Sequence, residues 1–366
     1  MARGLSWRNF DFLLLGAIVL ATAFGVAMIR SAVAGNDQLA PLVGRQIYFA
    51  IGGLIAIFII AAMDYHYWLA LYRPIYFVMM VLLIALFLSA QAVFGAARWF
   101  QVGVLFVQPT EFAKIVVILI LARYFDNTQN EPRNIPWIVR AFLWVFFLMI
   151  WILLQPNLSN VIVIMVIFFA MLWINGMDIR QLATIGGSIL LLAVIVFPFL
   201  QTYQQNRVLN FIRPQSNVSY GETYNVEQAL ISIGSGGLFG KGYGHGTQTQ
   251  LRFLKVRHTD FIFSAISEEF GLIGGVLVIL VEIFIVWRCI RAAQKARDVS
   301  GAMIAYGVAV LLFFQGMANI AVNLKLIPVS GLPLPFVSYG GSGLASLMLG
   351  VGLVESVVMR HKPMEF

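Results

Sequence analysis

Long apolar runs separated by short polar segments make up most of the chain. Ten of these runs approach the roughly 20 residues that a helix needs to cross the hydrocarbon core of a membrane. They cover residues 11–32, 46–63, 75–94, 109–125, 137–155, 159–175, 181–201, 262–287, 302–323 and 341–359. The pattern predicts an all-α, polytopic membrane protein of about ten transmembrane helices, forming a single membrane domain over residues 1–366.

Two of these assignments have alternatives. Only Gln155 to Leu158 separate the fifth run from the sixth, so a long hairpin also fits there. The sequence Ala32-Val33-Ala34 resembles a signal-peptidase site after the first run. The first run, at about 18 residues, is longer than the apolar region of a signal peptide, so we expect a retained helix.

Basic residues in the short connections indicate the orientation. With the N-terminus inside, thirteen Lys and Arg residues lie in inner connections and four, Arg30, Arg45, Arg98 and Lys325, lie in outer ones. Short cytoplasmic loops carry the excess of positive charge, so both termini are expected in the cytoplasm. Residues 202–261 then form a long extracytoplasmic loop before the eighth helix.

The composition supports a membrane protein. The chain is 60% hydrophobic and 11% charged, with a mean hydropathy of +0.88. Soluble domains are about 25% charged, so a water-soluble enzyme, a DNA-binding protein and a disordered tail are excluded. We assign the net charge of +8 to orienting loops, with no nucleic acid partner. Cys289 is the single cysteine, so no internal disulfide is possible.

Four ionisable residues lie at the outer ends of the predicted helices: Arg45, Glu111, Lys114 and Asp260. Ionisable groups in spans are costly and are usually functional. Glu111 and Lys114 share one helix face, which fits either a structural ion pair or the lining of an outward-facing cavity. Asp260 begins a polar stripe that includes Glu268 if the helix continues, or it is a helix-start carboxylate favoured by the macrodipole.

Two outer loops have unusual composition. Residues 234–246 are rich in glycine around Lys241, but they lack the first Gly and the Ser or Thr of a Walker motif. They fit an anion cradle or turns that need positive φ. Residues 328–343 contain three prolines and then Ser338 and Ser342 at the start of the last helix. This segment fits an anion site at a helix N-terminus or a rigid re-entrant turn.

The four histidines are scattered, with no paired His/Cys spacing of a transition-metal site. A hard cation held by Asp or Glu would leave no such signature, so the metal ligands are unknown. The residues together predict an outward-facing polar cavity with one carboxylate, several cations and two possible anion cradles. Such a cavity suits an anionic lipid-linked substrate that is either modified or moved.

Several motifs resemble the SEDS family of bacterial cell-wall proteins. They are Gly-Leu-Pro-Leu-Pro-Phe (331–336) followed by Ser338 to Ser342, Ile-Gly-Ser-Gly-Gly (233–237), His-Thr-Asp-Phe-Ile-Phe (258–263), Gln-Pro-Thr-Glu (108–111) and Arg98-Trp99. The resemblance spans nearly the whole chain. It favours the elongation branch over the division branch, because Ser330 stands where division members usually carry Lys.

The resemblance implies a peptidoglycan glycosyltransferase that polymerises lipid II outside the cytoplasmic membrane. It also implies a class B penicillin-binding protein as partner. Asp260 occupies the position of the family's essential aspartate, and Arg98, Glu111 and Lys114 match its cavity residues. The chain departs from the family at Asn157, where an Asp is common, so a metal site that uses that carboxylate is less favoured.

The expected mechanism is displacement with inversion at a sugar carried on a lipid pyrophosphate. Asp260 is predicted to be the general base. Lys114, Arg98 and Lys241 are candidates to stabilise the leaving group, with a divalent cation (Mg or Mn) as a possible helper. Arg45, Ser338 and Ser342 are further candidates for substrate binding. The alternatives are a lipid II flippase and a scaffold that only recruits the penicillin-binding protein.

Overall fold

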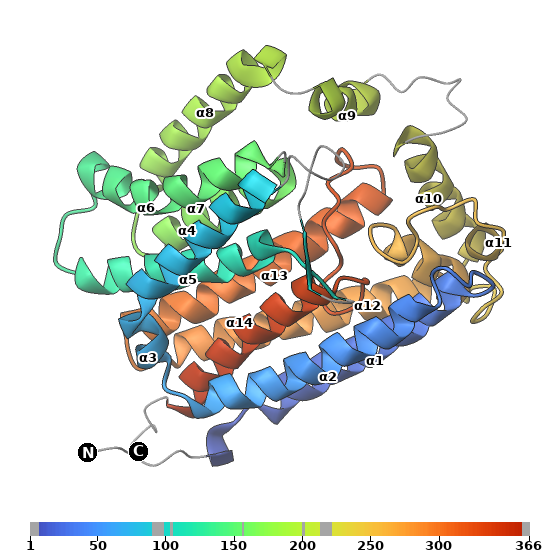
Figure 1. Ribbon diagram of the computed structural model, residues 1–366, viewed down its shortest axis with the longest axis horizontal. Helices are drawn as coiled ribbons and strands as arrows, with labels where there is room; N and C mark the ends of the chain where they lie inside the picture. The colour runs from blue at the N-terminus through green and yellow to red at the C-terminus, as the bar shows by residue number, and fades with distance from the viewer. Residues whose placement is uncertain are drawn as a thin grey trace.

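The computed structural model describes residues 7–89, 99–102, 105–155, 157–199, 202–212 and 222–360. Within them the chain is almost entirely helical (Figure 1). Ten helices correspond to the ten predicted spans: α1 (Phe12–Val33), α2 (Pro41–Ala62), α4 (Tyr72–Ser89), α5 (Pro109–Asn127), α6 (Ile135–Leu154), α7 (Leu158–Ile174), α8 (Ile179–Val196), α12 (Ile262–Gln294), α13 (Val299–Asn323) and α14 (Gly341–Met359).

The shorter elements connect these helices. They are the 3-10 helices η1 (Trp7–Asn9) and η3 (Phe197–Phe199), the helices α3 (Tyr65–Ala70), α9 (Thr202–Ile212), α10 (Glu222–Gly236) and α11 (Thr247–Gln250), and the strands β1 (Phe100–Val102) and β2 (Leu105–Val107). The strands pair antiparallel, with Gln101 opposite Phe106. Three helices, α9 to α11, therefore lie in the segment 202–261 that was predicted as one long loop.

The all-α membrane architecture predicted from the apolar runs is confirmed. Seven of the described helices are long and apolar enough to cross a membrane: α1, α2, α4, α6, α12, α13 and α14. Helix α7 is apolar but has only 17 residues. Helix α5 contains four charged residues, and it is buried along most of its length, so protein rather than lipid surrounds it. Because Gln155 and Asn157 separate α6 from α7, the fifth and sixth runs form two helices.

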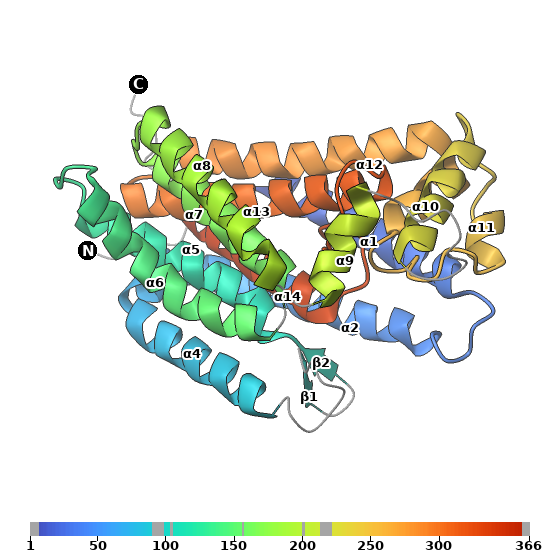
Figure 2. The same ribbon diagram turned by 90° about the horizontal axis from the view of Figure 1, so that it is seen from above.

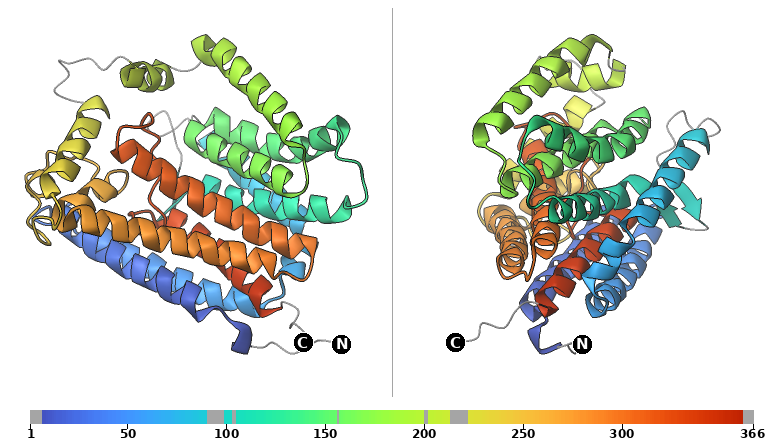
Figure 3. Two further views of the ribbon diagram at one scale, coloured as in Figure 1. Left: turned by 180° about the vertical axis from the view of Figure 1, so that it is seen from behind. Right: turned by 90° about the vertical axis from the view of Figure 1, so that its left-hand side faces the viewer.

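Helix α14 lies at the centre of the bundle and packs on α2, α5, α12 and α13 (Figures 1 and 2). Small residues bring α2 and α14 together. A Cβ added to Gly53 would lie 2.1 Å from the Met348 sulfur, and one on Gly352 would lie 3.0 Å from Ile60. Close helix packing through small residues is typical of membrane bundles. Helix α8 packs on α7 at the outside of the bundle, and α9 lies near the end of α8 (Figure 3).

The start of α1 and the end of α14 lie at the same end of the bundle, which we call the terminal end (Figure 3). The Asp11 amide donates to the Glu355 carboxylate at 3.0 Å, and Arg288 of α12 pairs with Asp11 at 2.5 Å. The opposite end, where α2, α5, α12 and α14 begin, is called the cavity end. The start of α1 and the end of α14 at one end agree with an even number of membrane crossings.

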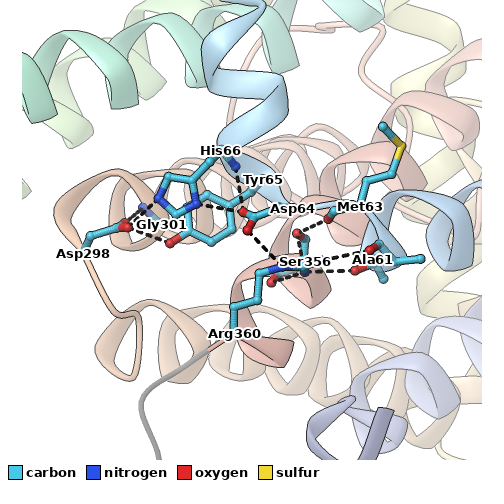
Figure 4. A network of polar contacts seen from close by, with 10 residues as sticks. Ala61, Met63, Asp64, Tyr65, His66, Asp298, Gly301, Ser356 and Arg360 are labelled. Atoms are coloured by element: carbon cyan, nitrogen blue, oxygen red, sulfur yellow. Dashed lines mark hydrogen bonds and ion pairs between the residues drawn. The ribbon is translucent and has the colours of Figure 1, made fainter. Parts of the chain in front are cut away.

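A network of polar residues, the terminal-end network, ties several elements together (Figure 4). It consists of Asp64, Tyr65, His66, Asp298 and Arg360. The His66 ring bridges Asp64 at 2.7 Å and Asp298 at 2.9 Å, while the Tyr65 hydroxyl donates to Asp298 at 2.7 Å. Arg360 reaches Asp64 at 3.4 Å. Burial acts to raise the pKa of Asp64. Hydrogen bonds from the His66 amide and ring outweigh burial and hold this pKa below its ordinary value.

Candidate active site

A cavity of about 820 Å³ lies at the cavity end. Its walls come from Arg45 and Phe49 of α2, from the first turns of α5, α7 and α14, from the β1–β2 hairpin, from α9 and α13, and from the segments 259–260 and 327–333. Among the predicted site residues, the lining includes Arg45, Glu111, Asp260 and Ser342. The structure therefore brings together four residues that are up to 297 positions apart in the sequence. Its volume is in the range of sites that bind small molecules.

Asp260 lies two residues before α12 begins. Hydrogen bonds to their carbonyls hold the residues that precede it: the Tyr339 amide donates to the His258 carbonyl at 2.9 Å, and the Ser338 hydroxyl donates to the Thr259 carbonyl at 2.7 Å. The Asp260 carbonyl itself accepts from Asn319 at 2.9 Å. The aspartate therefore belongs to a fixed segment rather than to the polar stripe of a continuous helix.

Burial lowers the pKa of His258, and the charge of Arg257 adds to this effect. The imidazole beside the aspartate segment is therefore held neutral near pH 7. Arg257 itself is buried, and its guanidinium donates to the Ala32 carbonyl at the end of α1. The segment that carries Asp260 is thus anchored to α1 as well as to the last loop.

Arg45 is the principal cation on the α2 side of the cavity. It contacts the Tyr339 hydroxyl. Burial raises the pKa of Tyr339, and the contact with Arg45 partly offsets that rise. Gln46 joins the same wall to the start of α14: its Nε2 donates to the Ser338 carbonyl at 3.2 Å, and its Oε1 accepts from the Gly340 amide at 3.2 Å. Arg45 and the amino-terminal turn of α14 consequently face one space.

Glu111 and Lys114 form an ion pair of 2.8 Å at the start of α5. The Lys114 side chain is fully buried, whereas Glu111 reaches the cavity lining. Asn160 of α7 donates to Glu111 at 3.2 Å and accepts from Lys114 at 3.4 Å. Both sequence alternatives for this pair hold at once, because it joins α5 to α7 and also presents a carboxylate to the cavity.

Ser338 lies behind the cavity wall. Its hydroxyl donates to the Thr259 carbonyl and accepts from the Leu334 amide at 2.8 Å. Both bonds are internal to the protein, so the residue fixes the turn after the prolines against the aspartate segment. Ser342, by contrast, lines the cavity in the first turn of α14.

Lys241 lies away from the cavity lining. Its ammonium pairs with Glu268 at 2.9 Å and bonds Ser235 and Thr247, both at 2.8 Å. Glu268 also accepts from the amides of Gln248 and Thr249 at 2.8 and 3.0 Å. The structure therefore does not place Lys241 or Glu268 with Asp260, because these two residues hold the loop before α11 against α12.

The glycine-rich segment packs into a break in α12. Gly271 has φ 68° and ψ −164°, which interrupts the helix. The Leu272 amide donates to the Gly237 carbonyl at 2.8 Å, and the Lys241 amide donates to the main-chain carbonyl of Glu268 at 3.0 Å. A Cβ on Gly240, whose φ is 81°, would lie 2.2 Å from the Glu269 carbonyl. Turns with positive φ and close backbone contact thus explain the glycines, and several amides that an anion would need are already bonded.

Arg98 lies outside the described residues, so its role as a cavity residue stays a prediction. Trp99 beside it lines the cavity. The sequence reasoning missed Arg207 of α9, which lines the cavity, and Asn319 and Asn323 of α13, which bond the aspartate segment. The two asparagines had a signal, because they lie four residues apart in an apolar run. Arg207 had none, since a loop cation is common.

The described residues contain no group of three or more His, Cys, Asp and Glu side chains placed to hold a metal ion. Two predicted carboxylates, Glu111 and Asp260, reach the cavity, and Glu111 already pairs with Lys114. Asn157, at the position of the lost carboxylate, donates to Thr110 at 3.4 Å. A divalent cation that helps the leaving group therefore stays a prediction, and its ligands stay unknown.

Comparison with proteins of known sequence shows which proteins this chain resembles. The chain is 34% identical to the peptidoglycan glycosyltransferase MrdB of Escherichia coli K12 over 349 residues, which cover 94% of this chain and 92% of that protein. It is also 34% identical to the probable peptidoglycan glycosyltransferase FtsW of Hydrogenovibrio crunogenus, covering 96% and 93% of the two chains. Both the elongation-type and the division-type branches are thus similar to this chain.

Two solved structures have the same fold. One belongs to a study of the structural coordination of polymerization and crosslinking by a peptidoglycan synthase complex; it has a TM-score of 0.82 and 27% identity, covering 96% of this chain and 98% of its own. The other is the rod shape determining protein RodA of Thermus thermophilus, with a TM-score of 0.72 and 27% identity over 98% and 99%. A family model for the FtsW, RodA and SpoVE cell cycle proteins matches residues 7–363. The chain belongs to this family, the SEDS family that its motifs indicated.

Proposed function

We propose that this chain polymerises lipid II into glycan strands at the outer face of the cytoplasmic membrane during cell elongation, with Asp260 as the general base. It is a multi-pass inner-membrane peptidoglycan glycosyltransferase, the enzyme class predicted from the sequence and confirmed by its relatives. One observation carries the mechanism: a single cavity brings Asp260, Arg45, Glu111 and the start of α14 together.

The reaction joins an acceptor hydroxyl oxygen to the anomeric carbon of the donor sugar. The bond from that carbon to the lipid pyrophosphate breaks, and its electron pair leaves with the pyrophosphate. The hydroxyl proton passes to the Asp260 carboxylate, and the configuration at the carbon inverts. Asp260 suits this step because its main chain is anchored while its side chain lies at the cavity wall.

The departing pyrophosphate needs positive charge on the cavity side. Arg45 supplies it in this proposal, supported by the amides of the first turn of α14 around Ser342. Lys114 acts through Glu111, because its ammonium is buried and already paired. The leaving-group role first predicted for Lys241 passes to Arg45, since Glu268 holds the Lys241 ammonium.

A flippase reading is less consistent with the arrangement. A transporter needs a polar path that opens to both faces of the membrane. In the described part of the chain the cavity lies at one end of the helices, while the terminal-end network ties the start of α3 to α13 and α14 at the other (Figure 4). One-sided access favours chemistry on a substrate already at the outer surface.

We also propose a class B penicillin-binding protein as the partner that crosslinks the strands. A structural neighbour of this chain was solved in a study of a peptidoglycan synthase complex, and that study's subject is the coordination of polymerization and crosslinking. Since the glycan product leaves at the outer surface, a transpeptidase anchored in the same membrane would receive it directly.

The test is polymerisation of labelled lipid II by the purified protein, with and without the partner. Asp260→Asn should lower the rate by about 10²–10⁴-fold, the range for loss of a general base. Asp37→Asn is the matched control, because Asp37 is an exposed carboxylate between α1 and α2. Normal glycan synthesis by a folded Asp260→Asn variant would overturn the assignment of the base. Lipid II transfer across vesicles without glycan chains would instead favour a flippase.

A further inference from the structure

Helix α13 carries three amide side chains on one face: Gln315, Asn319 and Asn323. A spacing of four residues places them in one line along the helix. All three are buried, with exposed fractions of 1%, 1% and 0%. Polar side chains inside a membrane bundle are costly and usually functional, so their partners matter.

Asn319 joins two walls of the cavity. Its Nδ2 donates to the Asp260 carbonyl at 2.9 Å and to the Leu332 carbonyl at 2.8 Å. An amide nitrogen has two protons, so both are used. One side chain thus fixes the aspartate segment and the proline-containing loop at the same time.

Asn323 repeats the contact one turn further on. Its Nδ2 donates to the Asp260 carbonyl and to the Asn319 carbonyl, both at 2.8 Å. Its Oδ1 accepts from the Ser264 amide at 3.1 Å and from the Ser264 hydroxyl at 2.6 Å. The asparagine therefore ties the main chain of Asp260 to the first turn of α12 as well.

The loop that Asn319 holds is the surface beside the catalytic carboxylate. A Cβ on Gly331 would lie 3.9 Å from Asp260 Oδ2, so the carboxylate lies next to residue 331. The next residue, Leu332, bonds Asn319. Helix α13 consequently holds both the main chain of Asp260 and the loop segment beside its carboxylate. Gln315, one turn earlier, has no hydrogen-bond partner among the described residues for either atom of its amide.

We propose that Asn319 and Asn323 are positioning residues that set the reach of the Asp260 carboxylate toward the acceptor hydroxyl. This inference rests on the proposed role of Asp260 as the base. A hydroxyl and its base must lie within hydrogen-bond distance in the reactive complex. A displacement of about 1 Å lowers the rate by about 10²-fold. Loss of the asparagine donors therefore lowers kcat while substrate binding is retained.

The experiment compares Asn319→Asp, Asn319→Leu and Asn323→Asp with Gln315→Leu. The aspartates keep the shape of the side chain but remove the two N–H donors. Gln315→Leu is the matched control: it removes a buried amide from the same helix face without breaking a hydrogen bond. For each variant, binding of labelled lipid II in detergent gives the Kd and the number of competent sites. Polymerisation rates normalised to those sites give kcat and KM.

The Asn319 and Asn323 variants should lose about 10–100-fold in kcat per competent site, with Kd and KM within about 3-fold of the wild type. Gln315→Leu should stay within about 3-fold in every quantity. A wild-type kcat per competent site in all three asparagine variants overturns the inference. So does a loss confined to the number of competent sites, which marks a structural role. Failure of the base itself is separate, because it would appear as activity in Asp260→Asn.

Discussion

The buried pair of Glu111 and Lys114 allows a test of what each charge contributes. Removing one partner of a buried ion pair leaves an uncompensated charge and lowers stability by about 3–5 kcal/mol, whereas replacing both is often nearly neutral. We expect Lys114→Met to lower the free energy of unfolding by about that amount. Glu111→Gln should have a similar effect, and the double variant a smaller one than either. Thermal unfolding of the purified variants in detergent measures this cycle.

Independent additive losses would contradict this coupling and would show that each side chain acts alone. The polymerisation rate adds a second readout. Because Glu111 reaches the cavity and Lys114 does not, activity in the double variant reports the role of the carboxylate after stability is restored.

At the residue scale the sequence was informative where partners are close in the chain. Glu111 and Lys114 share a face by spacing alone, and their ion pair followed from that. The partner of Lys241 is Glu268, 27 positions away, and nothing local identifies it. A glycine-rich loop with a lysine has the same pattern whether the lysine meets a ligand or another side chain. Only the fold decides which.

Single helices were predictable because apolar runs of sufficient length have few alternatives in a membrane. Each of the ten runs contains a described helix, and the helix ends differ from the predicted ones by up to seven residues. The elements that were missed lie outside such runs. Helices α9 and α10 are amphipathic or polar, and the β1–β2 hairpin is only six paired residues long. The break in α12 at Gly271 was missed too, because glycines in an apolar run are also common in unbroken membrane helices.

The break gives a prediction about α12 as an element. Gly271→Ala would place a Cβ 2.4 Å from the Gly240 amide and from the Leu238 carbonyl, on a backbone with φ 68°. Strain of this kind is worth about 1–3 kcal/mol before the clash is counted. We expect a clear fall in the melting temperature. Gly16→Ala is the matched control, since Gly16 lies within α1 and a Cβ there meets nothing within 4 Å.

The same variant separates the two interpretations of the glycine-rich segment. If the glycines serve packing, lipid II binding per folded molecule stays near the wild-type value while stability falls. A variant that is as stable as the wild type but no longer binds lipid II would favour an anion cradle instead.

The described part of the molecule has its polar cavity at one end, and the start of α1 and the end of α14 at the other. One experiment on orientation therefore decides which face carries the chemistry. The terminal end carries most of the basic residues of short connections, including Arg8, Arg73, Arg291 and Lys295. Cytoplasmic loops carry that excess. We expect a fluorescent protein joined after Phe366 to fluoresce. Alkaline phosphatase, which needs an oxidising compartment to form its disulfides, should be inactive there and active when joined after Asp37.

The reverse pattern would place the cavity on the cytoplasmic side and would contradict polymerisation at the outer face of the membrane. A matched pair of fusions at Asp178 and Asp37 controls for expression, because both positions are exposed connections but at opposite ends of the bundle. The cavity geometry indicates the chemistry, and the charge distribution independently indicates the side of the membrane on which it takes place. Inactive phosphatase after Phe366, active phosphatase after Asp37 and loss of glycan synthesis in Asp260→Asn would together support an outward-facing cavity with Asp260 as its base.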